Sequence, residues 1–458
     1  HLLSRRQRQM CIRDRNTMTE LMNAEQVEAY LEYEEMTDEE KELTAKENSL
    51  EQEYEQLSSE EFYYEYDGEE WDLNRLNMEA DEMDHDAVVE IYQGICKQRN
   101  DAVGEVFVEL VDVRNEIAKL NGYDNYAEYA YDAVYVRDYT LDETRDLLKE
   151  IRKHVVPVMA DMKDVLNDTD YMRLYSEGQG IESTSIIEQI GPYLEEIDPE
   201  LKDTQEHFLK YRLYDMDTSQ NKANTAFTMR LSYFKDGFIY GQMYDNYMDY
   251  YNVIHEFGHY NNVYRSADTF FESSNNIDVS EIHSQGMQIL FYDYYDELLG
   301  EDIGDIYAFY DVYSMADNAI STALISEFEI AAYENPDMTL EELNKLYLQL
   351  SRRYGMQYDS KIKELYTWSE VPHIFTSPCY YFSYLTSAFS SLDILTMAEE
   401  DRHEAVETYM TLTTIPGYVP YCSAVEYAGL RDIFDDGVAQ DIIEAVSYTH
   451  LRAHETSL

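Results

Sequence analysis

Two histidines four residues apart are the first candidates for chemistry in this chain. The stretch YYNVIHEFGHYNNVY, residues 250–264, contains His255 and His259, with Glu256 next to the first. On a helix, positions i and i+4 lie on one face, so a single rigid element can present both imidazoles to one point. Zinc is bound tetrahedrally by imidazoles about 2 Å away. The spacing indicates two metal ligands with a neighbouring base, and two structural histidines are the alternative interpretation.

A catalytic zinc site needs a third protein ligand and one open position. The next helical segment, residues 276–299, offers Glu281 and His283. Glu281 shares a helix side with Ser284 and Gln288, so we expect it to point inward with a polar stripe. A surface carboxylate is the alternative, because the chain has 94 acidic residues. His283 lies nearly opposite on the helix, and we expect it to be a neighbour of the site rather than a ligand.

The histidine pair requires a helix, which the pattern predicts over residues 247–264. Ile254 and Phe257 can face a core while the two histidines share another side. Gly258 lies inside this helix, where it costs about 1 kcal/mol relative to Ala. We therefore expect another backbone or a substrate to approach the helix closely at Gly258.

A small sheet is predicted immediately before this helix. Residues 225–243 are rich in Thr, Phe, Tyr and Ile, and Asp236-Gly237 in their middle is typical of a hairpin turn. The rest of the chain reads as helix after helix, with no proline before Pro157. Gly122 is predicted to end one long helix, and the acidic residues 26–70 are predicted to form solvated helices. The predicted fold class is mainly α.

Composition limits the possible partners. The formal net charge of -60 argues against nucleic acid, whose phosphates need Lys and Arg, and against an anionic membrane surface. No apolar run approaches the roughly 18 residues of a membrane span. The four cysteines form no CxxC pair, so we expect free thiols.

The two ends of the sequence differ from the rest. Residues 1–16 are rich in arginine in an otherwise acidic chain, and residues 447–458 contain two of the eleven histidines. Both resemble translated sequencing adapters, so we expect them to contribute nothing to the fold. We expect an N-terminal helical lobe over residues 17–200, truncated at its start, and a catalytic region over residues 201–446. Free thiols favour a cytoplasmic location, although the native N-terminus is expected to be missing.

Three ordered blocks resemble a known family. His255-Glu256-Phe257-Gly258-His259, the segment Ser280–Gln285 and the segment His373–Tyr384 (HIFTSPCYYFSY) are similar to motifs of the thimet oligopeptidase and oligoendopeptidase F zinc metallopeptidases, which have a zincin fold. The similarity covers roughly residues 90–440. It implies a large multi-helix body that encloses a deep channel, with the small sheet beside the HExxH helix.

The resemblance implies a role for each candidate residue. His255, His259 and Glu281 would hold one zinc ion per chain, and Glu256 would be the general base and acid of peptide hydrolysis. Of the candidate donors in the third block, Tyr381 or Tyr384 would stabilise the oxyanion, and His373 would bind the substrate backbone. A helix starting near Pro378 would place the two tyrosines on one face and turn Tyr380 and Phe382 away.

This chain departs from the family pattern at two positions. An acidic residue is usual seven positions after the third ligand, where this chain has Gln288, and an amide orients a metal-bound histidine less strongly than a carboxylate. Cys379 replaces a usual Phe.

The predicted activity is hydrolysis of internal bonds in short, unfolded peptides, with the 225–243 strand pairing with the peptide backbone. The alternatives are a helical HExxH carboxypeptidase and a catalytically weak peptide-binding homologue.

Overall fold

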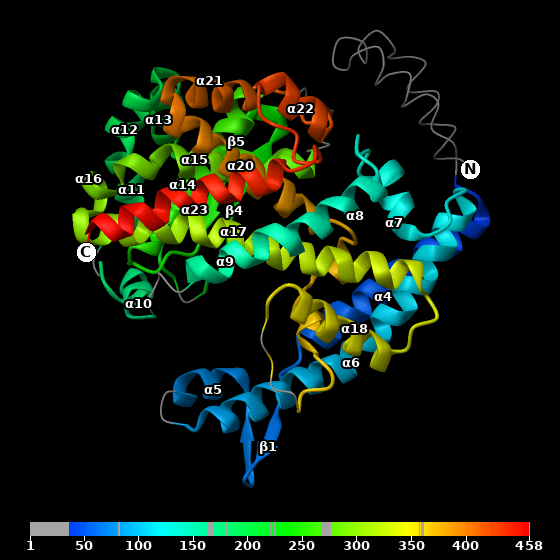
Figure 1. Cartoon of the computed structure of the whole chain (residues 1–458). Helices are drawn as coiled ribbons and strands as arrows, with labels where there is room; N and C mark the ends of the chain where they lie inside the picture. The colour runs from blue at the N-terminus through cyan, green and yellow to red at the C-terminus, as the bar shows by residue number, and fades with distance from the viewer. Residues whose placement is uncertain are drawn as a thin grey trace. The chain divides into compact units, whose positions relative to one another are not determined.

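The computed structural model describes residues 36–80, 83–163, 168–178, 181–219, 221–223, 225–266, 276–356, 358 and 361–457. They form a mainly helical protein with two small sheets (Figure 1). Two compact units divide them. The first contains residues 158–317 and 386–457, and the second contains residues 36–157 and 318–385. The boundary that we predicted at residue 200 lies inside the first unit.

The first unit holds the predicted metal ligands. Its elements, including the helices that it shares with the second unit, are α9 (Val156–Lys163), α10 (Asp168–Ser176), α11 (Ser183–Gln189), α12 (Gly191–Ile197), α13 (Pro199–Tyr211), β3 (Tyr214–Asp215), β4 (Ala226–Leu231), β5 (Asp236–Gly241), α14 (Met248–Arg265), α15 (Ile277–Phe291), α16 (Tyr295–Leu299), α17 (Glu301–Glu334), α20 (Phe382–Glu400), α21 (Arg402–Leu412), α22 (Tyr421–Ala428) and α23 (Val438–Ser457).

The second unit contains α4 (Asp38–Ser58), β1 (Tyr64–Tyr66), β2 (Glu69–Trp71), α5 (Leu73–Glu79), α6 (His85–Leu120), α7 (Tyr126–Tyr129), α8 (Leu141–Glu150), α18 (Leu340–Arg353) and α19 (His373–Thr376). Local sequence explains several of its helix ends. Capping boxes open α4, α8 and α18, each with a Thr before the helix and a Glu three residues later. Gly122, at φ 89°, lies two residues after the last residue of α6 and follows its C-cap Asn121, which confirms the predicted stop.

The sheet of the first unit has the strand order β3-β5-β4, with β4 and β5 antiparallel. It packs against α14, which confirms the predicted sheet beside the histidine helix. The predicted turn at Asp236-Gly237 is wrong, because these residues begin β5. The chain reverses through a 3₁₀ turn at Ser232–Phe234, followed by Lys235 in the left-handed region at φ 52°. Gly237 instead allows close packing, since a Cβ there would lie 3.0 Å from the Tyr260 ring.

The acidic region before α6 also departs from prediction. Residues 38–58 are helical, but β1 and β2 form an antiparallel hairpin within the range predicted as helix. Asp67 and Gly68 connect the strands at φ 52° and 82°. An Asp-Gly pair with two positive φ values is the favoured turn of a two-residue hairpin, so the sequence did carry this signal.

The helices α14 and α15 form the pair that brings the candidate ligands together. A Cβ at Gly258 of α14 would lie 2.3 Å from the carbonyl oxygen of His283 and 2.7 Å from Cα of Ser284, both on α15. Glycine is therefore required for the two backbones to approach this closely. The expected close approach at Gly258 is confirmed, and the approaching group is another backbone.

The predictions for the chain ends are tested only in part. Residues 1–16 lie outside the described residues, and the backbone of residues 447–457 continues α23. Cys96, Cys379 and Cys422 form no disulfide bond, as predicted, and Cys11 lies outside the described range.

Among the helices in the described part of the chain, none is both long enough and apolar enough to cross a membrane.

Candidate metal centre and active site

The three predicted ligands converge on one point. His255 and His259 come from α14 and Glu281 from α15, and one donor atom of each lies within 4.8 Å of the others. The Nε2 atoms of His255 and His259 lie 3.3 and 3.2 Å from the same oxygen of Glu281. With ligands 2.0–2.1 Å from a zinc ion, the edges of a coordination tetrahedron measure about 3.3–3.4 Å. The donor set and its spacing therefore fit zinc.

The electrostatics of the cluster favour a positive charge between its members. Burial lowers the pKa of His255, but the hydrogen bond and charge of Glu281 and the charge of Glu256 outweigh this and raise it to about 9. Burial raises the pKa of Glu281, whereas the charge of His259 and hydrogen bonds from both histidines bring it well below its usual value. A divalent cation bound between His255, His259 and Glu281 would supply the positive charge that these half-buried side chains stabilise.

Glu256 is fixed by the neighbouring sheet. Its side chain is buried, and one carboxylate oxygen accepts a hydrogen bond of 2.7 Å from the Thr228 hydroxyl on β4. The same hydroxyl lies 2.9 Å from the backbone oxygen of Glu256. β4 thus orients the predicted general base next to the metal ligands.

The second ring nitrogen of His255 is hydrogen-bonded to the side-chain amide of Gln288. His255 Nδ1 lies 2.9 Å from Oε1 of Gln288. Gln288 is fully buried, and its Nε2 donates a hydrogen bond of 2.6 Å to Oδ1 of Asp311 on α17. Burial raises the pKa of Asp311 to about 7, against the opposing effects of the Tyr295 hydroxyl and the charge of His255. Because Nδ1 faces Gln288, Nε2 of His255 is the nitrogen that is directed to the metal point.

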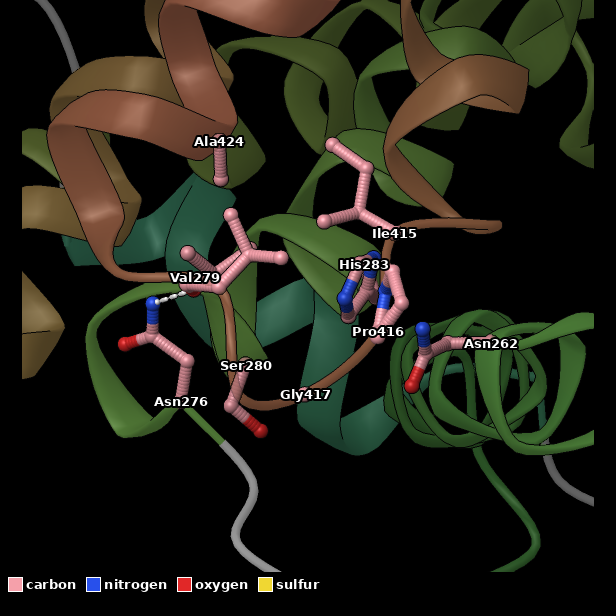
Figure 2. A pocket seen from close by; sticks show the side chains of 10 residues that line it. Asn262, Asn276, Val279, Ser280, His283, Ile415, Pro416, Gly417 and Ala424 are labelled. Atoms are coloured by element: carbon pink, nitrogen blue, oxygen red, sulfur yellow. Dashed lines mark hydrogen bonds between the residues drawn. The ribbon is translucent and has the colours of Figure 1, made fainter. Parts of the chain in front are cut away.

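His283 is outside the ligand group, as predicted, and lines an adjacent pocket (Figure 2). Its imidazole lies among Ile415, Pro416 and Asn262. Burial and the nearby charge of His259 lower its pKa to about 3, so the ring is neutral. Nδ1 has no hydrogen-bond partner among the described residues. The pocket therefore combines an apolar wall with a neutral imidazole next to the candidate ligands.

Comparison with solved structures shows the same fold in several peptidases. PZ peptidase A, solved with an inhibitor, matches 91% of this chain and 78% of its own chain, with a TM-score of 0.75 and 23% identity. A candidate oligoendopeptidase F matches 92% of this chain and 77% of its own chain, with a TM-score of 0.73 and 24% identity. Another candidate oligoendopeptidase F, from Bacillus anthracis str. Ames, matches 92% of this chain and 77% of its own chain, with a TM-score of 0.71 and 23% identity.

The chain has the oligoendopeptidase F fold. This confirms the fold expected from the three sequence blocks. No protein-family model and no curated protein sequence matches the chain. At these identities the likeness concerns the fold, and the His-His-Glu group is a candidate metal site within it.

The third block of the oligoendopeptidase F resemblance lies in the second unit and forms an aromatic cluster. The ring of His373 lies 5.1 Å from that of Tyr381 and 6.0 Å from that of Tyr384. Tyr380 also stacks on His373 at 5.4 Å, so the expectation that it turns away is wrong. The reason is that α20 begins at Phe382, four residues after Pro378, which leaves Tyr380 in the preceding turn. Phe382 is buried, and the catalytic role of the cluster stays a prediction.

Sequence reasoning missed two residues that support the centre. Thr228 lies on β4, where exposed and partly buried residues alternate, and its sequence context gives no sign that its hydroxyl contacts a catalytic residue. Asp311 lies 23 residues beyond Gln288 in a helix rich in acidic residues. The only sequence feature that could have pointed to Asp311 is Gln288 itself. An amide stands there in place of the acidic residue that the family resemblance leads us to expect, so a carboxylate could be sought elsewhere.

Proposed function

We propose that this chain is a zinc-dependent endopeptidase that hydrolyses internal bonds of short, unfolded peptides. The observation that carries the proposal is the convergence of His255, His259 and Glu281 beside a buried Glu256, in a chain with the fold of known peptidases. His373, Tyr381 and Tyr384 are included as substrate and oxyanion donors on the basis of the motif resemblance. A deep channel that excludes folded proteins belongs to the same proposal.

Zinc in this site would supply Lewis acidity, which polarises a peptide carbonyl and makes a water molecule more acidic. Glu256 would accept the proton of the attacking water at its carboxylate and deliver it to the leaving amine. Thr228 would keep one carboxylate oxygen of Glu256 in place through its 2.7 Å hydrogen bond. The other oxygen would then be available for the proton transfer.

The position of β4 supports a binding mode for the peptide. In the part of the chain that the structure describes, β4 is the outer strand of its sheet, paired only with β5. Phe227 and Met229 are exposed on this strand, while Thr228 between them contacts Glu256. An extended peptide that pairs with the free edge of β4 would pass next to the general base.

Turnover of an internally quenched peptide, blocked at both ends, tests the proposal. We expect the zinc-loaded protein to cleave it, Glu256→Gln to retain zinc without turnover, and the control Glu297→Gln, an exposed site on α16, to behave as wild type. Cleavage only of peptides with a free C-terminus would favour a carboxypeptidase. Zinc and peptide binding without any turnover would favour a peptide-binding homologue.

A further inference from the structure

Hydrogen bonds connect His255 to the buried carboxylate of Asp311 through the side chain of Gln288. His255 Nδ1 faces Oε1 of Gln288 at 2.9 Å, and Nε2 of Gln288 donates to Oδ1 of Asp311 at 2.6 Å. The other oxygen of Asp311 accepts a hydrogen bond of 2.9 Å from the Tyr295 hydroxyl. Gln288, Asp311 and Tyr295 are all fully buried. This hydrogen-bonded network therefore lies in the core of the first unit.

An amide cannot fix the tautomer of a histidine by itself. Its oxygen accepts and its nitrogen donates, and the two ends are nearly equal in shape, so a glutamine can present either one to an imidazole nitrogen. If its nitrogen faced His255 Nδ1, that atom would have to accept, and the ring proton would move to Nε2. Nε2 would then carry a proton where the metal must bind.

Asp311 removes this ambiguity. An ionised carboxylate only accepts hydrogen bonds, so the group of Gln288 that faces it must be the NH₂ group. The oxygen of Gln288 is then left for His255, whose Nδ1 must donate. Nε2 of His255 is consequently the nitrogen whose lone pair can be offered to a metal ion at the point where Glu281 and His259 converge.

We infer that Asp311 is a positioning residue for the metal centre, which acts by orienting the Gln288 amide so that His255 offers Nε2 to a metal ion. The inference rests on the proposed zinc site. Asp311 supplies, through one intervening amide, the carboxylate that is missing at position 288. Partners that orient a metal-bound histidine typically contribute 10- to 100-fold in metal affinity.

The alternative is that the network only stabilises the core. Tyr295 separates the two possibilities, because Tyr295→Phe removes the hydrogen bonds of its hydroxyl to Asp311 and to the backbone oxygen of Gln288 but leaves the hydrogen bond between the Gln288 and Asp311 side chains in place. A purely structural network would lose stability in Asp311→Asn and in Tyr295→Phe, with zinc affinity unchanged in both. A positioning role would lower zinc affinity only in Asp311→Asn, because an asparagine can face Gln288 with either end of its amide.

The test is zinc affinity by chelator competition at pH 8, above the pKa of about 7 to which burial raises Asp311, together with melting temperature. We expect Asp311→Asn to bind zinc about 10- to 100-fold more weakly than wild type, and Tyr295→Phe to bind it within about threefold. The double variant Gln288→Glu/Asp311→Asn should recover most of the affinity, because a carboxylate at position 288 can accept directly from His255. This rescue also keeps the test valid if the single variant folds poorly.

Two outcomes would overturn the inference in distinguishable ways. Equal zinc affinity in wild type and Asp311→Asn would defeat the positioning role and leave the zinc site standing. A wild-type protein that binds no zinc would defeat the proposed site and the inference with it. Histidine ¹⁵N spectra of the zinc-loaded protein give a second readout, in which we expect His255 to bind through Nε2 with Nδ1 protonated.

Discussion

Gly258 offers a direct test of how α14 and α15 hold the candidate ligands together. A Cβ at this position would lie 2.3 Å from the carbonyl oxygen of His283, whereas real Cβ contacts essentially never fall below 3.0 Å. Gly258→Ala must therefore separate the two backbones by about 0.7 Å, the difference between these distances. Metal sites tolerate deviations of only about 0.2 Å in ligand distance. Because Glu281 lies two residues before His283, this shift should spoil the ligand geometry.

The stability change in Gly258→Ala has two opposing parts. Alanine favours a helix by about 1 kcal/mol over glycine, while overpacking a rigid contact costs roughly 1–3 kcal/mol. Since the contacted atoms are backbone, we expect the upper end of that cost and a net loss of about 2 kcal/mol. Zinc affinity should fall at least about tenfold through the displaced ligands.

The assay combines chelator competition for zinc with thermal unfolding. Gly104→Ala is the matched control, because it lies within helix α6 and the atoms nearest to its new Cβ would all belong to the flexible Leu340 side chain rather than to a backbone. We expect the control to keep wild-type zinc affinity. Wild-type zinc affinity and melting temperature in Gly258→Ala would refute the argument that glycine is needed for ligand convergence.

Three further predictions concern single side chains. Thr228→Val should lower kcat about tenfold with zinc content unchanged, because a hydrogen bond to the charged Glu256 is worth roughly 1.5–3 kcal/mol; an unaltered kcat would show that Thr228 does not position the base. Burial raises the pKa of Glu329 from 4.5 to about 7, so the folded protein keeps a proton that the unfolded chain releases, and stability falls as pH rises through this window. Glu329→Gln should therefore gain on the order of 3 kcal/mol relative to wild type between pH 5 and pH 8 in denaturant unfolding, and parallel pH curves would contradict this. Tyr384→Phe should lower kcat about 100-fold if its hydroxyl is the oxyanion donor, with Tyr380→Phe as the control, and equal kcat values in the two variants would end that assignment.

The metal ligands were predictable because their information is local. The spacing of His255 and His259 places both on one helix face, and the same periodicity turns Glu281 inward on the next helix. Gly258 carried a further signal, since a helical glycine implies close contact. The structure joins these features through the backbone contact at His283.

The supporting residues were not predictable because their information is tertiary. Thr228 reaches Glu256 only because the sheet packs on α14. Asp311 reaches Gln288 from a different helix. The turn before β5 was misplaced because the sequence gives no clear indication that Lys235 adopts a left-handed conformation, whereas Asp236-Gly237 is a strong but misleading turn signal.

The zinc content of purified protein tests the central claim most directly. We predict about one zinc ion per chain in the wild type, essentially none in His259→Ala, and the wild-type amount in His403→Ala, which changes an exposed histidine on α21. A wild type without zinc, or a His259→Ala variant that retains it, would contradict the assignment of His255, His259 and Glu281 as the metal centre.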